Sequence, residues 1–190
     1  MFLLHRPSRE EIGEFLALQK DSVFSYSEVG ASRDHAPGRY RVDHNRVALG
    51  YGATLFDLAV EAIRSWKMFD MSWLSLCWPE ASLEVGATVA VLTSHFGFWS
   101  MNACRIVYVI DERGSSRRYG FAYGTLVEHA EIGEERFSVE LQPEDQSVWY
   151  DLYAFSRPRG LARVAYPLSR LLQRRFANDS KTAMRRAVEV

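Results

Sequence analysis

The chain has 190 residues, of which 47% are hydrophobic, 13% aromatic and 25% charged, and its formal net charge is −1. These shares are ordinary for a soluble globular protein, and the length predicts a single domain over residues 1–190. The apolar start before His5 is too short for a signal peptide, and polar side chains interrupt the uncharged stretch 85–104. We therefore expect no membrane span and a cytoplasmic location.

A helix is expected close to the N-terminus. Ser8 is a favourable N-cap, and Glu11 follows three residues later in the register of a capping box. Ile12 and Phe15 then begin an apolar pattern with helical spacing. Residues 25–38 mix polar side chains with glycine and proline, so we expect them to form a loop.

The next segment predicts a strand, a helix and a second, short strand. Residues 40–49 alternate in polarity and are followed by two glycines within 50–52, which is typical of a strand that ends in a turn. Residues 54–69 carry apolar side chains on one helical stripe. Residues 73–78 could form a short strand that Pro79 stops.

Five more strands are expected in succession, because apolar alternation recurs at roughly regular spacing. They cover residues 87–96, 100–111, 118–129, 134–142 and 147–156. Short connections between successive strands favour antiparallel pairing. Gly120, Gly124 and Gly133 do not form a phosphate-binding loop, since no helix follows them. Within a strand, such glycines mark a bulge or leave space for a bulky neighbour.

A long amphipathic helix is predicted from Gly160 to the C-terminus, and Pro167 either ends its first turn or kinks it. Its apolar stripe consists of Leu161, Val164, Leu168, Leu171, Leu172, Phe176, Ala183 and Ala187. Sequential strands closed by such a helix predict an α+β fold, in which a curved antiparallel sheet of six or seven strands grips a long C-terminal helix. Folds of this outline often enclose a cavity.

The charge of the chain is unevenly distributed. Residues 157–190 contain nine Lys or Arg and two acidic residues, a net charge of +7, whereas the other residues carry −8. The basic helix either meets the acidic body of its own domain and water, or it contacts an anionic partner. Nucleic acid is the weakest candidate for that partner, because no RNA- or DNA-binding motif accompanies the charge.

The densest polar cluster is segment 128–135. Its histidine and glutamates could ligate a metal or pair a general base with an acid. Their spacing fits no established metal motif, and the segment spans an expected hairpin turn where solvated charge is usual, so we predict neither a metal nor a cofactor. His129 shares strand parity with Phe121 and Tyr123, so we expect it to point inward.

A second polar cluster covers residues 43–46. His44 could form a base–orienter pair with a carboxylate from the hairpin. Alternatively, His44 and Asn45 fix the loop that begins the helix at residue 54. The cysteines Cys77 and Cys104 lie in apolar stretches without metal-like spacing, which predicts two buried thiols in a reducing cytosol.

The strands are rich in aromatic side chains, which either fill a core or line an apolar pocket with a few polar anchors. The candidate ligand-binding residues are Asn102, Phe121, Tyr123, His129 and Tyr150. Asp151 has the opposite strand parity to Tyr150, so the two are not expected in one pocket without a bulge.

Three stretches carry a resemblance to a known family: residues 42–47 with Gly50 and Gly52, residues 120–140, and residues 148–158. Together they are similar to the bacterial and plant family called domain of unknown function 1990, over nearly the whole chain. This resemblance brings no catalytic residue with it. The order of strands and helices is also similar to the helix-grip fold of START-like lipid and hydrophobic-ligand binders.

Three functions follow from these patterns. The favoured one is binding of a small hydrophobic or amphipathic ligand between the sheet and the C-terminal helix. The first alternative is a small hydrolase or cyclase that uses His129 or His44 as a general base in that cavity. The second alternative is an interaction module that uses the basic helix.

Overall fold

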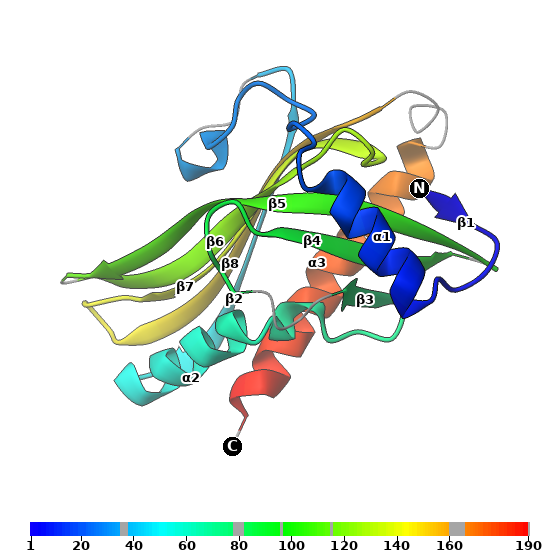
Figure 1. The fold of residues 1–190 in the computed structure, drawn as a ribbon. Coiled ribbons are helices and arrows are strands. Elements are labelled where there is room, and N and C mark those ends of the chain that lie inside the picture. Colours follow the sequence, from blue (N-terminus) through cyan, green and yellow to red (C-terminus); the bar gives the residue numbers. More distant parts are fainter. Residues whose placement is uncertain (35–37, 78–81, 96, 115, 160–165, 190) are drawn as a thin grey trace.

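The computed structural model describes residues 1–34, 38–77, 82–95, 97–114, 116–159 and 166–189, and these form one eight-stranded antiparallel sheet with helices on both faces (Figure 1). The strands are β1 (Phe2–Leu3), β2 (Arg41–Tyr51), β3 (Leu74–Cys77), β4 (Thr88–His95), β5 (Phe98–Arg113), β6 (Arg117–Thr125), β7 (Glu131–Leu141) and β8 (Ser147–Pro158). The helices are α1 (Arg9–Gln19), α2 (Ala53–Arg64), α3 (Tyr166–Val188) and the 3₁₀ turns η1 (Ala31–Arg33) and η2 (Lys67–Phe69).

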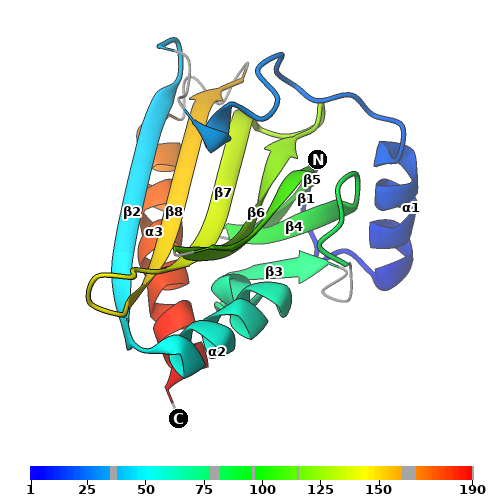
Figure 2. The ribbon, with the colours of Figure 1, turned by 90° about the vertical axis from the view of Figure 1, so that its left-hand side faces the viewer.

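The strands cross the sheet in the order β2-β8-β7-β6-β5-β4-β3, and the two-residue β1 pairs with β5 (Figure 2). From β3 to β8 the neighbours are consecutive in the chain, because short connections return each strand antiparallel to the one before. β2 closes the far edge beside β8, where Val47 and Tyr150 are opposite each other. The predicted curved antiparallel sheet with its long C-terminal helix is confirmed.

Helix α3 packs on the concave face of the sheet. Ala177, Ser180 and Ala183 are buried on α3, which packs against η2 and α2 as well as against β2 and β8. The Ser180 and Tyr150 hydroxyl oxygens lie 2.8 Å apart between α3 and β8. This contact holds one half of the helix against the sheet.

The predicted apolar stripe of the last helix is partly wrong. Leu171 is 63% exposed and Leu168 is 44% exposed, whereas Leu172 is partly buried. The buried line of the helix instead runs through small residues and Met184, so the helix is rotated relative to the prediction. The start of the predicted helix, with Leu161 and Val164, lies outside the described residues.

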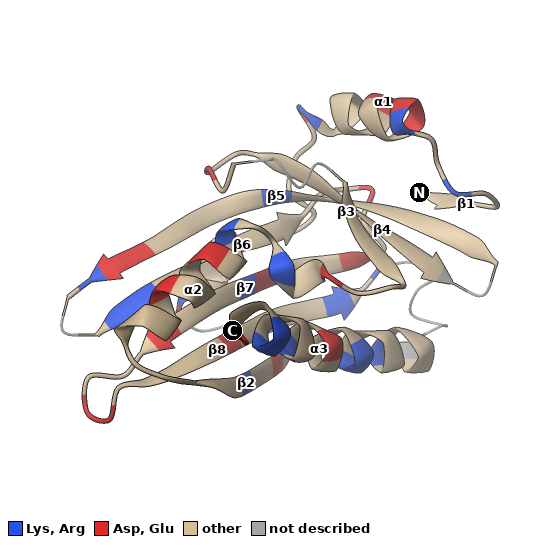
Figure 3. Ribbon diagram, turned by 90° about the horizontal axis from the view of Figure 1, so that it is seen from below, with Lys and Arg blue, Asp and Glu red and all other residues tan. Residues whose placement is uncertain are grey.

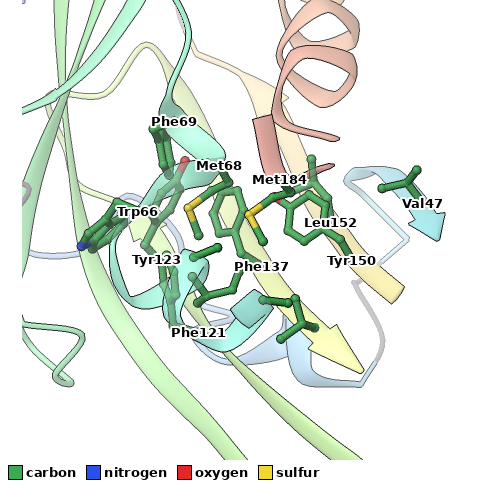
Figure 4. Close-up of a cluster of buried hydrophobic side chains, with 14 of the residues drawn as sticks. Val47, Trp66, Met68, Phe69, Phe121, Tyr123, Phe137, Tyr150, Leu152 and Met184 are labelled. Carbon is green, nitrogen blue, oxygen red and sulfur yellow. The ribbon is translucent and has the colours of Figure 1, made fainter. Parts of the chain in front are cut away.

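The main core lies between the concave face, α2, η2 and α3 (Figure 4). The ring centroid of Phe137 is 5.3 Å from that of Phe121 and 5.4 Å from that of Phe69. The helix predicted to reach residue 69 ends at Arg64, because Trp66 adopts a left-handed conformation with φ 55°. The following 3₁₀ turn then directs Phe69 into the core.

The opposite face of the sheet is covered by α1 and by the loop before β2. The predicted capping box of α1 forms: the Glu11 amide donates to Ser8 Oγ at 3.2 Å, and the Ser8 amide donates to Glu11 Oε2 at 2.7 Å. Ile12 and Phe15 pack against Leu92 and its neighbours on this face. None of the helices within the described ranges is long and apolar enough to cross a membrane.

Glycines allow two close approaches within β6. A Cβ atom on Gly120 would lie 2.1 Å from the carbonyl oxygen of Phe137, and one on Gly124 would lie 2.0 Å from the Tyr26 hydroxyl. Gly124 therefore leaves space for Tyr26 from the loop before β2, as expected for a glycine within a strand that has a bulky neighbour.

Strand β6 is shorter than predicted, which changes the setting of His129. The strand ends at Thr125, and a turn follows in which the His129 amide donates to the Leu126 carbonyl oxygen at 3.0 Å. The prediction that His129 points inward assumed that it lies on this strand, and that assumption was wrong. The position of this side chain depends on the turn.

Candidate functional site

A cavity of about 1230 Å³ lies between the concave face of the sheet and helix α3. Its helical wall comes from α3 residues between Leu168 and Asn178, so the cavity lies beside the N-terminal half of the helix. The apolar lining comes from η2, β3, β4, β8 and α3, through Phe69, Leu74, Val91, Leu152, Leu172 and Phe176. The neighbouring Leu171 is not part of the lining, because it points to solvent.

The five predicted ligand-binding residues separate into two groups. Asn102, Tyr123 and His129 line the cavity. Phe121 and Tyr150 lie in the packed core, where both are fully buried. The four predicted residues that lie on strands share the concave face, in agreement with the alternation of side chains along a strand. Alternation does not indicate where along a strand the packed core ends and the cavity begins.

Glu135 is the carboxyl group at the inner part of the cavity. It lies on β7, and its Oε2 accepts a hydrogen bond of 2.8 Å from the Tyr123 hydroxyl. Burial raises the pKa of Glu135 to about 7, and the nearby carboxylates of Glu131 and Asp43 act in the same direction, against the hydrogen bond from Tyr123. Burial also raises the pKa of Tyr123 well above its ordinary value, so this phenol stays a hydrogen-bond donor.

A polar seam joins α3 to β2 and β7 beside the cavity. Arg170 donates to Asp43 Oδ1 at 2.7 Å, and this hydrogen bond holds the pKa of Asp43 below its ordinary value. Gln173 donates to Glu131 and also to Ser156 Oγ, the latter at 3.1 Å. Burial raises the pKa of Glu131 despite these contacts.

His129 is a neutral side chain at the cavity wall. Its Nδ1 accepts a hydrogen bond of 3.0 Å from the Glu131 amide, so the proton of the neutral ring is on Nε2. Burial lowers the pKa of His129 to about 4. The ring can therefore donate one hydrogen bond to a ligand, but its basic nitrogen is already occupied.

His44 forms the predicted histidine–carboxylate pair, but with Asp151 of β8 instead of a hairpin carboxylate. Its Nε2 lies 2.6 Å from Asp151 Oδ2, and Arg136 donates to Asp151 Oδ1 at 3.0 Å. Because Tyr150 faces α3, its neighbour Asp151 faces away from α3. The imidazole of His44 therefore lies on the same face as Asp151, because alternation along β2 separates it from the core residue Val47. Although His44 is among the residues around the cavity, its ring does not point toward α3.

The glutamates of β7 are the residues whose roles the sequence did not reveal. Glu134 is buried on the convex face, where it accepts from the Tyr26 hydroxyl at 2.6 Å and from the Ser32 amide at 2.9 Å. Glu135 faces the cavity. The sequence predicts a strand over 134–142, in which Glu135 and Phe137 share a face, but it also predicts that segment 128–135 spans a hairpin turn with solvated charges; β7 in fact begins at Glu131. Among the described residues, no group of three or more His, Cys, Asp and Glu side chains is arranged to hold a metal.

Basic residues recur along α3 (Figure 3). Most of them contact the protein's own surface. Arg186 donates to the Asp70 carbonyl oxygen at 3.0 Å, and the Arg175 guanidinium lies 4.6 Å from the ring centroid of Trp73. Arg170 pairs with Asp43, as described above. These contacts fit the interpretation in which the basic helix meets the body of its own domain.

Some known proteins are similar to this chain in sequence, and a solved structure has the same fold. A "UPF0548 protein" of Deinococcus radiodurans is 37% identical over 98% of this chain and 98% of its own, and one of Dictyostelium discoideum is 32% identical over 99% and 96%. The crystal structure of hypothetical protein jhp0584 from Helicobacter pylori has the same fold, with a TM-score of 0.51, 12% identity and coverage of 85% and 95%. The family model described as "Domain of unknown function (DUF1990)" matches residues 25–183, and the chain belongs to this family.

Proposed function

We propose that the protein binds a small amphipathic molecule in the cavity between the sheet and α3. The observation that carries this proposal is the cavity itself, whose volume of about 1230 Å³ exceeds the roughly 300–1,000 Å³ of ordinary ligand pockets. Its walls combine aromatic and aliphatic side chains with a few polar groups, namely Asn102, Tyr123, His129 and Glu135. Such a lining suits a ligand with an apolar body and a polar end.

Packing physics supports an occupant for this space. Protein interiors are packed like organic crystals and leave few voids larger than a water molecule. A space of this size between two packed elements therefore holds solvent or a ligand. Leu172 and Phe176 face it from α3, and a ligand with an apolar body would cover both side chains.

The enzyme alternative with a histidine base has weaker support. The basic nitrogen of His129 is occupied by the Glu131 amide, and the Asp151 that orients His44 lies on the far side of the sheet. A proton-transfer role would fit Glu135 better, because it faces the cavity and its pKa is about 7. The interaction-module alternative is weakened by the contacts of the α3 arginines with their own domain.

Two adjacent leucines allow a controlled test of ligand binding. Leu172 lines the cavity, whereas Leu171 is 63% exposed on the other side of the same helix turn. We expect the neutral fluorophore N-phenyl-1-naphthylamine to bind saturably to the wild-type protein. Leu172→Gln should weaken this binding about tenfold, the equivalent of one lost apolar side-chain contact of about 1.5 kcal/mol, and Leu171→Gln should leave it unchanged.

The outcome is measured as a fluorescence titration, with circular dichroism as a check of folding. Absence of saturable binding by the wild-type protein would contradict the proposal. Equal losses in both variants would place the fluorophore on the surface of α3 and would contradict it as well.

We also propose that the chain folds as one unit in a reducing compartment. A single core that includes Val47 and Val188 supports the first part, and the buried free thiols of Cys77 and Cys104 support the second. Two separate transitions in chemical denaturation would contradict the single unit.

A further inference from the structure

We propose that the ligand of this cavity is an amphipathic amine, whose ammonium group pairs with the carboxylate of Glu135. This inference rests on the proposed ligand-binding function and adds the chemical class of the ligand. It depends on the hydrogen bond of Glu135, on the lack of a counter-ion for it among the described residues, and on the nearby aromatic rings.

Glu135 differs from Glu134, Arg136 and Glu140 on the same strand. Arg136 forms an ion pair of 3.0 Å with Asp151, and Glu140 forms one of 2.8 Å with Arg46. Glu134 accepts hydrogen bonds from a tyrosine hydroxyl and from backbone amides. For Glu135, the described part of the chain provides one hydroxyl donor, Tyr123, and no salt bridge.

A partly buried carboxylate without a cation is unfavourable, since burial removes part of its hydration and the one hydrogen bond from Tyr123 replaces only part of the lost stabilisation. Here the neighbouring carboxylates of Glu131 and Asp43 add repulsion. A cationic group on a ligand would reverse this balance, because it would neutralise Glu135 in the cavity wall, where charges interact more strongly than in bulk water. A ligand carboxylate in the same place would be repelled by Glu135 and Glu131, whereas the charge of Asp43 is balanced by Arg170.

Four of the described arginines line the cavity, and no salt bridge joins any of them to Glu135; Arg41 and Arg174 lie near Asp43. Arg170 forms its ion pair with Asp43, and Arg159 donates to the Val127 carbonyl oxygen. The negative charge of Glu135 therefore remains for a group that comes with the ligand.

Aromatic rings complete a site for a cation with an apolar body. The ring centroid of Phe69 lies 5.5 Å from that of Phe176 and 6.2 Å from that of Tyr123, whose hydroxyl reaches Glu135. Ring faces attract cations within about 6 Å, and the same rings accept hydrocarbon. An alkyl or aryl amine therefore matches both the carboxylate and the aromatic rings of the wall, whereas a neutral alcohol has no charge to pair with the carboxylate.

The test compares three ligands that share one hydrocarbon chain: octylamine, octanol and octanoate. Each competes against N-phenyl-1-naphthylamine at about pH 8, where amines are protonated and Glu135 is ionised. We expect octylamine to bind about tenfold more tightly than octanol, the equivalent of about 1.4 kcal/mol, and octanoate to bind most weakly. Glu135→Gln should reduce octylamine to the affinity of octanol and leave octanol unchanged.

Glu144→Gln is the matched control, because Glu144 is exposed in the connection between β7 and β8. Tyr123→Phe is a second variant that keeps the carboxylate, and it should retain the preference for the amine. Equal affinities of the three compounds, a preference for octanoate, or an amine preference that survives Glu135→Gln would each overturn the inference. If the fluorophore itself does not bind the wild-type protein, the ligand-binding function fails together with the inference.

Discussion

Replacement of Glu135 by glutamine should stabilise the protein at neutral and alkaline pH. Burial in the cavity wall raises the pKa of this carboxyl group from its ordinary value of 4.5 to about 7. The unfolded chain therefore loses its proton near pH 4.5, whereas the folded protein keeps it until about pH 7. Between these values the folded state binds the additional proton, so its stability falls as the pH rises.

The magnitude follows from the same two values. Each tenfold difference in proton affinity corresponds to about 1.4 kcal/mol, so a pKa of about 7 against 4.5 predicts a cost of about 3 kcal/mol above pH 7. Glutamine has nearly the same shape, and its carbonyl oxygen can accept the hydrogen bond from Tyr123. Glu135→Gln should therefore unfold like the wild-type protein at about pH 4, and be more stable by up to about 3 kcal/mol at about pH 8.

The assay is urea unfolding of both proteins at several pH values between these limits. The groups that face Glu135 are Tyr123 from β6, Cys104 from β5, Asp43 from β2, Tyr150 from β8 and Glu131 on its own strand. Their own titration is present in both proteins, so the difference between the two curves isolates Glu135. A difference that does not change with pH would refute the reasoning, and so would a variant that is less stable throughout.

Two further changes test the packing by chemical denaturation. Phe176→Ala should lower the free energy of unfolding by about 1–3 kcal/mol, less than for a fully buried aromatic residue, because one side of the ring faces the cavity. Leu171→Ala should change the free energy of unfolding by no more than about 0.5 kcal/mol. Equal costs would show that the face of α3 is misassigned. Gly120→Ala should cost more than about 2 kcal/mol, since its Cβ would meet the Phe137 carbonyl oxygen at 2.1 Å, whereas Gly13→Ala in the open helix α1 should stabilise by about 0.5–1 kcal/mol. A tolerated Gly120→Ala would contradict the close approach of β6 and β7.

Local patterns were sufficient to predict the order of the strands. Alternation of polarity between residues 87 and 156 reports which side chains are covered, and short connections restrict each strand to its sequence neighbour. The capping box at Ser8 and Glu11 is also a local signal, and it formed as predicted. Sheet and helix positions were therefore predictable because short-range physics determines them.

Positions that depend on long-range packing were not predictable in this way. The predicted stripe of α3 contained its large apolar residues, yet the buried positions of the helix are the small residues Ala177, Ser180 and Ala183 with Met184 and Val188. Leu171 is exposed as a consequence. Similarly, β6 ends at Thr125, and the chain then turns to return as β7. Strand alternation therefore does not determine the direction of the His129 side chain.

The two adjacent glutamates of β7 show why the cavity is better explained by a ligand than by imperfect packing. Alternation places Glu134 and Glu135 on opposite faces, so both must be covered by other elements. Glu134 receives a tyrosine, a serine and two backbone amides, and it thereby fixes the loop before β2. Glu135 receives only one hydroxyl from the described residues, although a neutral side chain there would relieve a cost of about 3 kcal/mol. Buried groups with raised pKa values concentrate at functional sites, because the stability that they remove from the fold is compensated by binding or catalysis. On this reasoning the carboxyl group of Glu135 belongs to the chemistry of the ligand and not to the stability of the fold.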